Sequence, residues 1–203
     1  MVKAELQNIK ASLVKKTTDT FLSGKYNTSI LLAFFLAFFN QVSGINAVIY
    51  YAPRLFELTG AAESAALLAT VGVGVTNLVF TAVGMFLIDR IGRKSLMLLG
   101  SFGYIASLGL CSWAFFSENF GIVPICIFAF IAAHAIGQGA VIWVFISEIF
   151  PNQHRGTGQA LGSFTHWIFA ALLTMFFPKM VTAFPAGYVF LFFCGMMVLQ
   201  LLW

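Results

Sequence analysis

The protein has 203 residues, of which 60% are hydrophobic and only 9% are charged, with 11 Lys and Arg against 7 Asp and Glu. Because about 25% of the residues in an ordinary soluble domain are charged, this composition excludes a soluble globular domain and a disordered chain. The few, scattered cations also exclude a nucleic-acid partner, so the composition predicts an integral protein of the lipid bilayer.

The charged residues leave six long uncharged stretches, each of 23 to 29 residues. Crossing about 30 Å of hydrocarbon takes about 20 apolar helical residues, so each stretch is long enough for one crossing and too short for two. We therefore predict an all-α membrane protein with six transmembrane helices, near residues 28–52, 64–88, 95–116, 122–147, 158–178 and 184–203. The last span stops at Trp203 without a polar flank, so we expect this helix to be truncated.

The positively charged residues predict the orientation of the chain. Nine of the eleven Lys and Arg residues lie before the first span, in 89–94 or at Arg155, and the other two are Arg54 and Lys179. Because cytoplasmic loops carry an excess of Lys and Arg, we expect a multi-pass protein of the cell membrane with its N-terminus in the cytoplasm.

Residues 1–25 form a predicted cytoplasmic segment ahead of a transmembrane lobe at 26–203. Apolar residues from Leu6 to Leu13 follow helical spacing among lysines, so 3–16 (KAELQNIKASLVKK) is expected to be a short amphipathic helix. A solvated tail, a helix on the membrane surface and a helix packed under the bundle all fit this segment.

Two loops on the same side carry charges at the membrane boundary, at 89–94 (DRIGRK) and 147–158 (SEIFPNQHRGTG). A carboxylate such as Glu148 is costly at this depth unless it is partnered. We predict a charge network that bridges the two loops and acts as a latch, formed by Asp89, Arg90, Arg93, Glu148 and Arg155. The simpler alternative is that these charges only set the topology.

Four polar residues gather in the first span, at Asn40, Gln41, Ser43 and Asn46. Amides at bilayer depth must find hydrogen-bond partners. Bonds between helices, worth about 0.6 kcal/mol each, are one use for them, but this density favours a ligand site. Because Gln41 and Asn46 are about 140° apart on an ideal helix, a distortion near Gly44 is needed for both to reach one cavity.

Later spans carry further polar and aromatic residues, at Asn77, Trp143, His166 and Trp167. Neutral donors and acceptors beside aromatic rings suit an uncharged polyhydroxylated ligand, whose CH face stacks on a ring while its hydroxyls bond to amides. The three cysteines lie apart within the spans, so we expect neither a metal site nor a cofactor. The predicted substrate-binding residues are Asn40, Gln41, Asn46, Asn77, Trp143, His166 and Trp167.

Three motifs, in this order, resemble the carboxy-terminal half of a sugar porter of the major facilitator superfamily. Residues 40–51 (NQVSGINAVIYY) are similar to the QQxSGxN…YY of the family's seventh helix. Residues 89–94 are similar to its D/E-R-x-G-R-R/K loop, and 143–156, with WVFISEIFP and Arg155-Gly156, to the end of its tenth helix. The likeness runs along essentially the whole chain.

The resemblance implies one six-helix half of a major facilitator fold, with a sugar site formed by Gln41, Asn46, Asn77 and Trp143. The chain departs from the family at three places. It has Asn40 in place of the family's first Gln, and His166 where the family carries Asn or Gln before a Trp. In the tenth helix, where the family tends to have prolines among the glycines, it has Gln138, Ala140 and Ile142. The resemblance also implies a missing N-terminal six-helix half as partner, with the substrate held between the halves.

The predicted function is transport of a monosaccharide by alternating access, in a partial chain, with sugar:proton symport and uniport both open. One alternative is a non-transporting sugar sensor or regulatory fragment. Another is an intramembrane hydrolase, because Ser163 and His166 lie three residues apart on one helical face. No GxSG motif is present in the sequence, and we expect no enzyme activity.

Overall fold

The computed structural model describes residues 19–203, which are helical and contain no strand. The α-helices are α2 (Asn27–Val42), α3 (Ile45–Tyr50), α4 (Ala52–Glu57), α5 (Glu63–Ile91), α6 (Arg93–Phe116), α7 (Val123–Ala133), α8 (Val141–Glu148), α9 (Arg155–Ala183) and α10 (Ala186–Leu202). A 3₁₀ helix at Phe120–Ile122 precedes α7, and a π-helical segment at His134–Gly139 separates α7 from α8. The predicted amphipathic helix at 3–16 lies outside the described residues.

The helices match the predicted spans. Five helical stretches of the described chain are long and apolar enough to cross a membrane, at Asn27–Tyr50, Glu63–Ile91, Arg93–Phe116, Phe120–Glu148 and Arg155–Ala183. The sixth predicted span corresponds to α10, a shorter apolar helix of 17 residues. The predicted fold class, an all-helical membrane protein, is confirmed.

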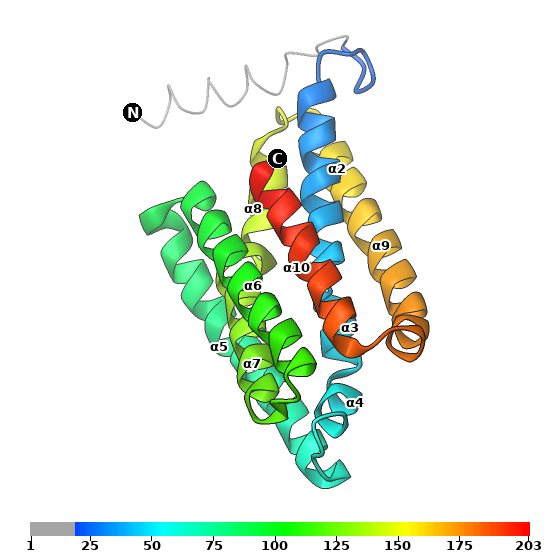
Figure 1. The fold of residues 1–203 in the computed structure, drawn as a ribbon. Coiled ribbons are helices and arrows are strands. Elements are labelled where there is room, and N and C mark those ends of the chain that lie inside the picture. The colour runs from blue at the N-terminus through cyan, green and yellow to red at the C-terminus, as the bar shows by residue number, and fades with distance from the viewer. Residues whose placement is uncertain (1–18) are drawn as a thin grey trace.

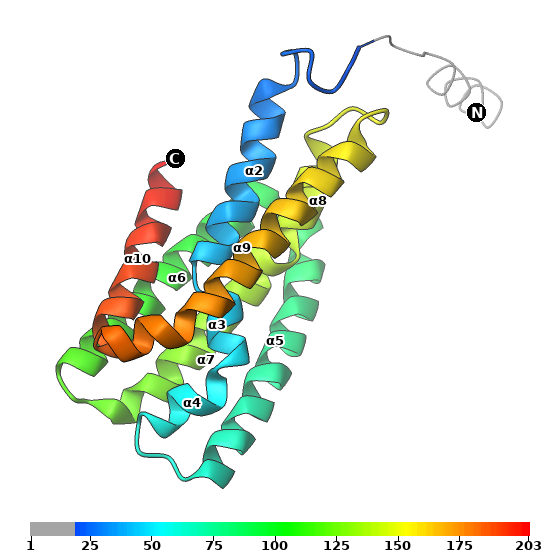
Figure 2. The ribbon, with the colours of Figure 1, turned by 90° about the vertical axis from the view of Figure 1, so that its right-hand side faces the viewer.

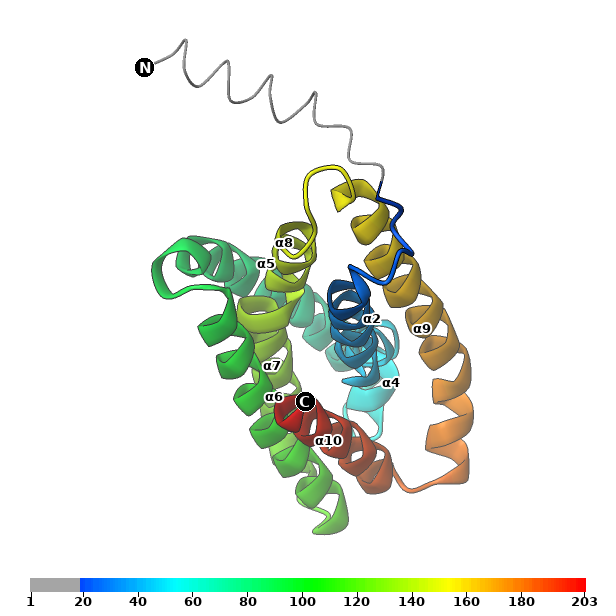
Figure 3. The same ribbon diagram turned by 90° about the horizontal axis from the view of Figure 1, so that it is seen from above.

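The first span lies at the centre of the bundle. Helix α9 packs against α2, and α10 packs against α6. Helix α6 also contacts α7 and the π-helical segment. Figure 1 shows α5, α6 and α7 as one group and α2 and α9 as another, with α10 between them. From above, α2 lies among α8, α9 and α10 (Figure 3). Consequently 61% of the residues in an apolar 18-residue window of the first span are buried, against 17% in α5 and 22% in α9.

Gly44 breaks the first span into α2 and α3. Helix α3 packs against α9 and is followed by α4, which packs against α5 (Figure 2). The φ of 87° at Gly44 is left-handed, a conformation that costs glycine little because glycine has no Cβ. A Cβ at this position would also come within 2.6 Å of the Phe193 ring of α10. The break at Gly44 turns α3 so that the side chains of Gln41 and Asn46 meet, as the expected distortion required.

The span that resembles the family's tenth helix is distorted between α7 and α8, at a place where it has no proline. Residues His134–Gly139 form a π-helical segment, which neighbouring helices approach closely. A Cβ on Gly137 would lie 2.5 Å from Cα of Gly100 in α6, and a Cβ on Gly84 in α5 would lie 2.9 Å from the Ile136 carbonyl oxygen. Small residues thus let two helices pack directly against this segment's backbone.

Candidate functional site

Gln41, in the last turn of α2, is the centre of a buried cluster of amides. Its Nε2 donates to Oδ1 of Asn40 at 2.9 Å and lies 3.0 and 3.1 Å from the two ring nitrogens of His166 on α9. Its Oε1 accepts from Nδ2 of Asn46 at 2.8 Å. Asn40 and Gln41 are fully buried and Asn46 is partly buried. The cluster therefore joins α2, α3 and α9 through neutral donors and acceptors.

Aromatic rings form one wall of this cluster. The His166 ring packs against Trp143 of α8, with centroids 4.9 Å apart, and against Trp167, at 5.0 Å. Nε2 of Gln159 donates to the Trp143 carbonyl at 2.8 Å, which ties α9 to α8 at this level. Trp167 is 59% exposed, so the cluster reaches the surface of the lobe at this residue.

A hollow lies on the same surface, between α3 and α9. It has a volume of about 440 Å³ and is lined by Tyr50, Tyr51, Trp167, Ala170, Ala171, Thr174 and Met175. The Tyr51 hydroxyl donates to the Thr174 carbonyl at 3.3 Å, which connects the two helices. The amide cluster is thus flanked by an open aromatic hollow that begins at Trp167.

Six of the seven predicted substrate-binding residues are brought together here, and Asn77 is not linked to them. Asn77 is half-buried on α5, and its side chain makes no hydrogen bond within residues 19–203. Ser163, considered for a hydrolase, likewise makes no hydrogen bond to His166 in the described chain. The His166 ring instead faces Gln41, Trp143 and Trp167.

A second buried polar cluster was missed from the sequence. Gln138 and Gln200 exchange two side-chain hydrogen bonds, of 2.8 and 3.1 Å, and Gln138 also donates to Ser101 at 3.1 Å. Gln200 is a lone amide in the last apolar span, and buried amides are almost always hydrogen-bonded. The sequence therefore indicated that Gln200 needs a partner. Its partner could not be read from the sequence.

Three of the five predicted charge-network residues meet at one end of the bundle. Nη2 and Nε of Arg93 lie 2.9 and 3.2 Å from the two carboxylate oxygens of Glu148, and Nη1 lies 3.1 Å from Oδ1 of Asp89. Arg90 instead stacks on Phe86, with its guanidinium 5.1 Å from the ring centroid. Arg155 is exposed, and neither it nor Arg90 forms an ion pair within residues 19–203. The bidentate pair joins the start of α6 to the end of α8.

Comparisons with a family model and with known proteins all point to the same family. The family model described as "Sugar (and other) transporter" matches residues 1–203. The arabinose-proton symporter of Bacillus subtilis (strain 168) is 34% identical over 205 residues, which cover 98% of this chain and 44% of that protein. The D-xylose-proton symporter of Escherichia coli (strain K12) is 39% identical over 152 residues, 74% of this chain and 31% of that protein. The glucose facilitated diffusion protein of Zymomonas mobilis is 31% identical, over 96% of this chain and 43% of that protein.

Solved structures agree with the sequence relatives. A crystal structure of a D-xylose-proton symporter matches with a TM-score of 0.80 and 34% identity, over 99% of this chain and 46% of that one. An inward-open structure of the E. coli xylose transporter matches with a TM-score of 0.78 and 31% identity, over 98% of this chain and 41% of that one. The chain thus spans less than half the length of these proteins. It belongs to the sugar porter family of the major facilitator superfamily.

Proposed function

We propose that this chain is the carboxy-terminal half of a transporter that moves a neutral monosaccharide across the membrane by alternating access. The observation that carries the proposal is the buried amide cluster at Gln41, beside the rings of Trp143 and His166. Amides supply both donors and acceptors, which sugar hydroxyls require, and the rings offer a face for the CH groups. Asn40 and Trp167 complete the proposed site, and Asn77 would join it from α5.

Two further parts of the proposal concern the surroundings of the lobe. The exposed apolar side chains of α5 and α9 would face lipid or a second six-helix half, with the site opening between the halves at Trp167. The nine Lys and Arg residues that the sequence assigns to the cytoplasmic side support an N-terminus in the cytoplasm and a place in the cell membrane. The relatives named above include proton symporters and a facilitated diffusion protein, so ion coupling is a separate outcome of the transport test.

The test is uptake of radiolabelled xylose, arabinose or glucose into proteoliposomes. We expect the chain alone to give no saturable uptake, because the site would lack the wall that a second six-helix half supplies, and its partly buried members Asn46 and His166 would face lipid there. Joined to the N-terminal half of the B. subtilis arabinose-proton symporter, it should give saturable uptake, and an imposed proton gradient shows whether uptake is coupled. Saturable uptake by the chain alone, with no dimer detected by cross-linking, would contradict the proposal.

In the joined transporter, Glu148→Gln should shift the balance between its two open states. The substitution removes the carboxylate that holds Arg93 and so weakens the contact between α6 and α8 at this end. Because exposed ion pairs are weak, the expected shift is modest, about two- to fivefold in the population open on this side. The labelling rate of a single cysteine at Thr157, measured with a membrane-impermeant thiol reagent, reports this opening.

Glu57→Gln is the matched control for Glu148→Gln. Glu57 also forms an exposed ion pair, 3.1 Å from Arg54, but both residues belong to one short helix, α4. Its loss should therefore leave the labelling rate at Thr157 unchanged. Equal labelling rates for both variants and the parent would show that the Arg93–Glu148 pair does not act as a latch.

A further inference from the structure

The π-helical segment is held by a pair of glutamines that face each other inside the lobe. Nε2 of Gln138 donates to Oε1 of Gln200 on α10 at 2.8 Å, and Nε2 of Gln200 donates back to Oε1 of Gln138 at 3.1 Å. The second donor of Gln138 reaches Oγ of Ser101 on α6 at 3.1 Å. The exposed fractions of the three residues are 1%, 8% and 5%. Three helices therefore meet at one amide whose donors are all satisfied.

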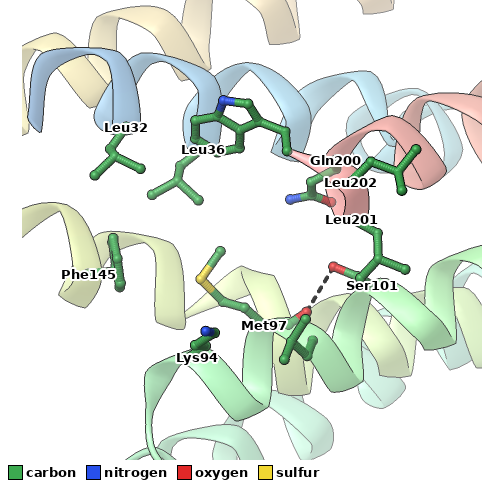
Figure 4. Close-up of a pocket in the computed structure, with 11 residues that line it drawn as sticks. Leu32, Leu36, Lys94, Met97, Ser101, Phe145, Gln200, Leu201 and Leu202 are labelled. Atoms are coloured by element: carbon green, nitrogen blue, oxygen red, sulfur yellow. Dashed lines mark hydrogen bonds between the residues drawn. The ribbon is translucent and has the colours of Figure 1, made fainter. Parts of the chain in front are cut away.

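Ser101 acts as an acceptor in this cluster. Its own hydroxyl hydrogen goes to the Met97 carbonyl at 2.9 Å, drawn as a dashed line in Figure 4, so an oxygen lone pair remains for Gln138. Ser101 and Gln200 also line a cavity of about 410 Å³, together with apolar side chains of α2, α6, α8 and α10. This space allows the side chain at position 200 to change without a clash.

The glutamine pair is connected to the amide cluster by the backbone of the π-helical segment. Nδ2 of Asn40 lies 3.5 Å from the Gln138 carbonyl oxygen, a long hydrogen bond, while Oδ1 of Asn40 accepts from Gln41. Asn40 is thus held on one side by the segment and holds Gln41 on the other. Single π-helical turns inside α-helices are frequent at functional sites, because they re-aim groups along the helix.

Two kinds of contact act on this segment, and they fix different things. The contacts of Gly84 and Gly100 with its backbone set how closely the helices approach, but they have little directional preference. The hydrogen bonds of Gln138 are directional, since they weaken steeply as their angle departs from linear. The His134 ring, at the start of the segment, also bonds the Tyr104 hydroxyl of α6. The Gln138–Gln200 pair is therefore the directional contact at the part of the segment whose carbonyl lies near Asn40.

We propose that Gln138, Gln200 and Ser101 are positioning residues for the sugar site, an inference that rests on the proposed function. They fix the π-helical segment, the segment anchors Asn40, and Asn40 orients Gln41. Through this path α10, which contributes no residue to the amide cluster, sets sugar affinity.

The experiment separates positioning from packing with methionine, which keeps the length of glutamine and removes its polar groups. Gln138→Met, Gln200→Met and the double variant are compared in the joined transporter, by melting temperature and by KM and maximal rate of sugar uptake. Each single variant leaves a buried amide without its glutamine partner, so it should melt at a lower temperature than the parent. The double variant removes both partners, so its melting temperature should return to near the parent value.

In the double variant, sugar affinity should stay below that of the parent even though the melting temperature recovers. Without the directional bonds, the double variant should keep a KM about tenfold above the parent, with a maximal rate within about twofold, as expected for the loss of one or two hydrogen bonds in the bound state. Ser101→Ala should raise KM in the same direction. The matched control is Ser112→Ala, because Ser112 is also a buried serine of α6 but bonds the Gly187 carbonyl of α10, away from Gln138. It should leave KM unchanged.

A KM that recovers together with melting temperature in the double variant would show that the pair only fills space. Hydrogen exchange of residues 134–139 gives a readout that does not depend on sugar. Gln200→Met should speed this exchange about tenfold, and Ser112→Ala should not. If the joined transporter moves no sugar, or Gln41→Ala leaves KM unchanged, the proposed function or its site fails, whereas unchanged exchange in Gln200→Met overturns the present inference by itself.

Discussion

Gln41→Ala is expected to lower sugar affinity about 10- to 100-fold in the joined transporter, the effect of losing one to two hydrogen bonds to sugar hydroxyls. Gln41 is the one residue that bonds Asn40, Asn46 and His166 at once. Its removal therefore takes away its own contacts with the ligand and disorders the neighbours that would share the ligand.

The same substitution should leave the lobe folded. Hydrogen bonds between membrane helices average about 0.6 kcal/mol, so the bonds of Gln41 to its three partners are together worth about 2 kcal/mol. Direct binding of labelled sugar and of its deoxy analogues, with circular dichroism as a check on folding, measures both effects. A site built to bond hydroxyls should bind an analogue that lacks one of them much more weakly.

Gln153→Ala is the control for Gln41→Ala, because Gln153 also donates a side-chain bond between distant parts of the chain, to the Tyr26 hydroxyl at 3.3 Å, but lies in the loop before α9. It should leave binding unchanged. If Gln41→Ala and Asn46→Ala both bind sugar as well as the parent, these amides are structural and the site lies elsewhere.

Gly137→Ala should destabilise the lobe by about 2 to 3 kcal/mol, the upper range for an overpacked core. A Cβ at this position would lie 2.5 Å from Cα of Gly100 and 2.9 Å from the Leu96 carbonyl oxygen. Both are backbone atoms, which cannot rotate away as a side chain can. The π-helical segment and α6 would have to separate, and the bonds of Gln138 would weaken with them.

Gly74→Ala provides the comparison, because a Cβ on Gly74 in α5 meets no atom within 4 Å among the described residues. Its melting temperature should equal or slightly exceed that of the parent, since alanine reduces the freedom of the unfolded chain. The melting temperatures of both variants are measured in detergent, from the fraction of protein that remains monodisperse after heating. The same melting temperature for Gly137→Ala and Gly74→Ala would show that α6 and the segment can separate freely.

The membrane spans could be predicted from the sequence because one physical constraint sets them. The thickness of the hydrocarbon core determines how many uncharged residues a crossing needs, and the six stretches between charges have that length. The family could be predicted because its motifs, such as DRIGRK at 89–94, are local in the sequence. Local features also indicated the break at Gly44, since glycine accepts the positive φ that the turn into α3 requires.

The partners of the polar residues were decided only by the tertiary structure. Gln41 and His166 are 125 residues apart, and Gln138 and Gln200 are 62 apart, so their meeting depends on how the helices cross and rotate. The same holds for the charges at the bundle end, where Arg93 bonds Glu148 while Arg155 stays exposed. Sequence determines which residues in this protein need partners, because a buried amide or carboxylate is costly alone. Packing determines which partners they find, because hydrogen bonds act over about 3 Å and depend on direction.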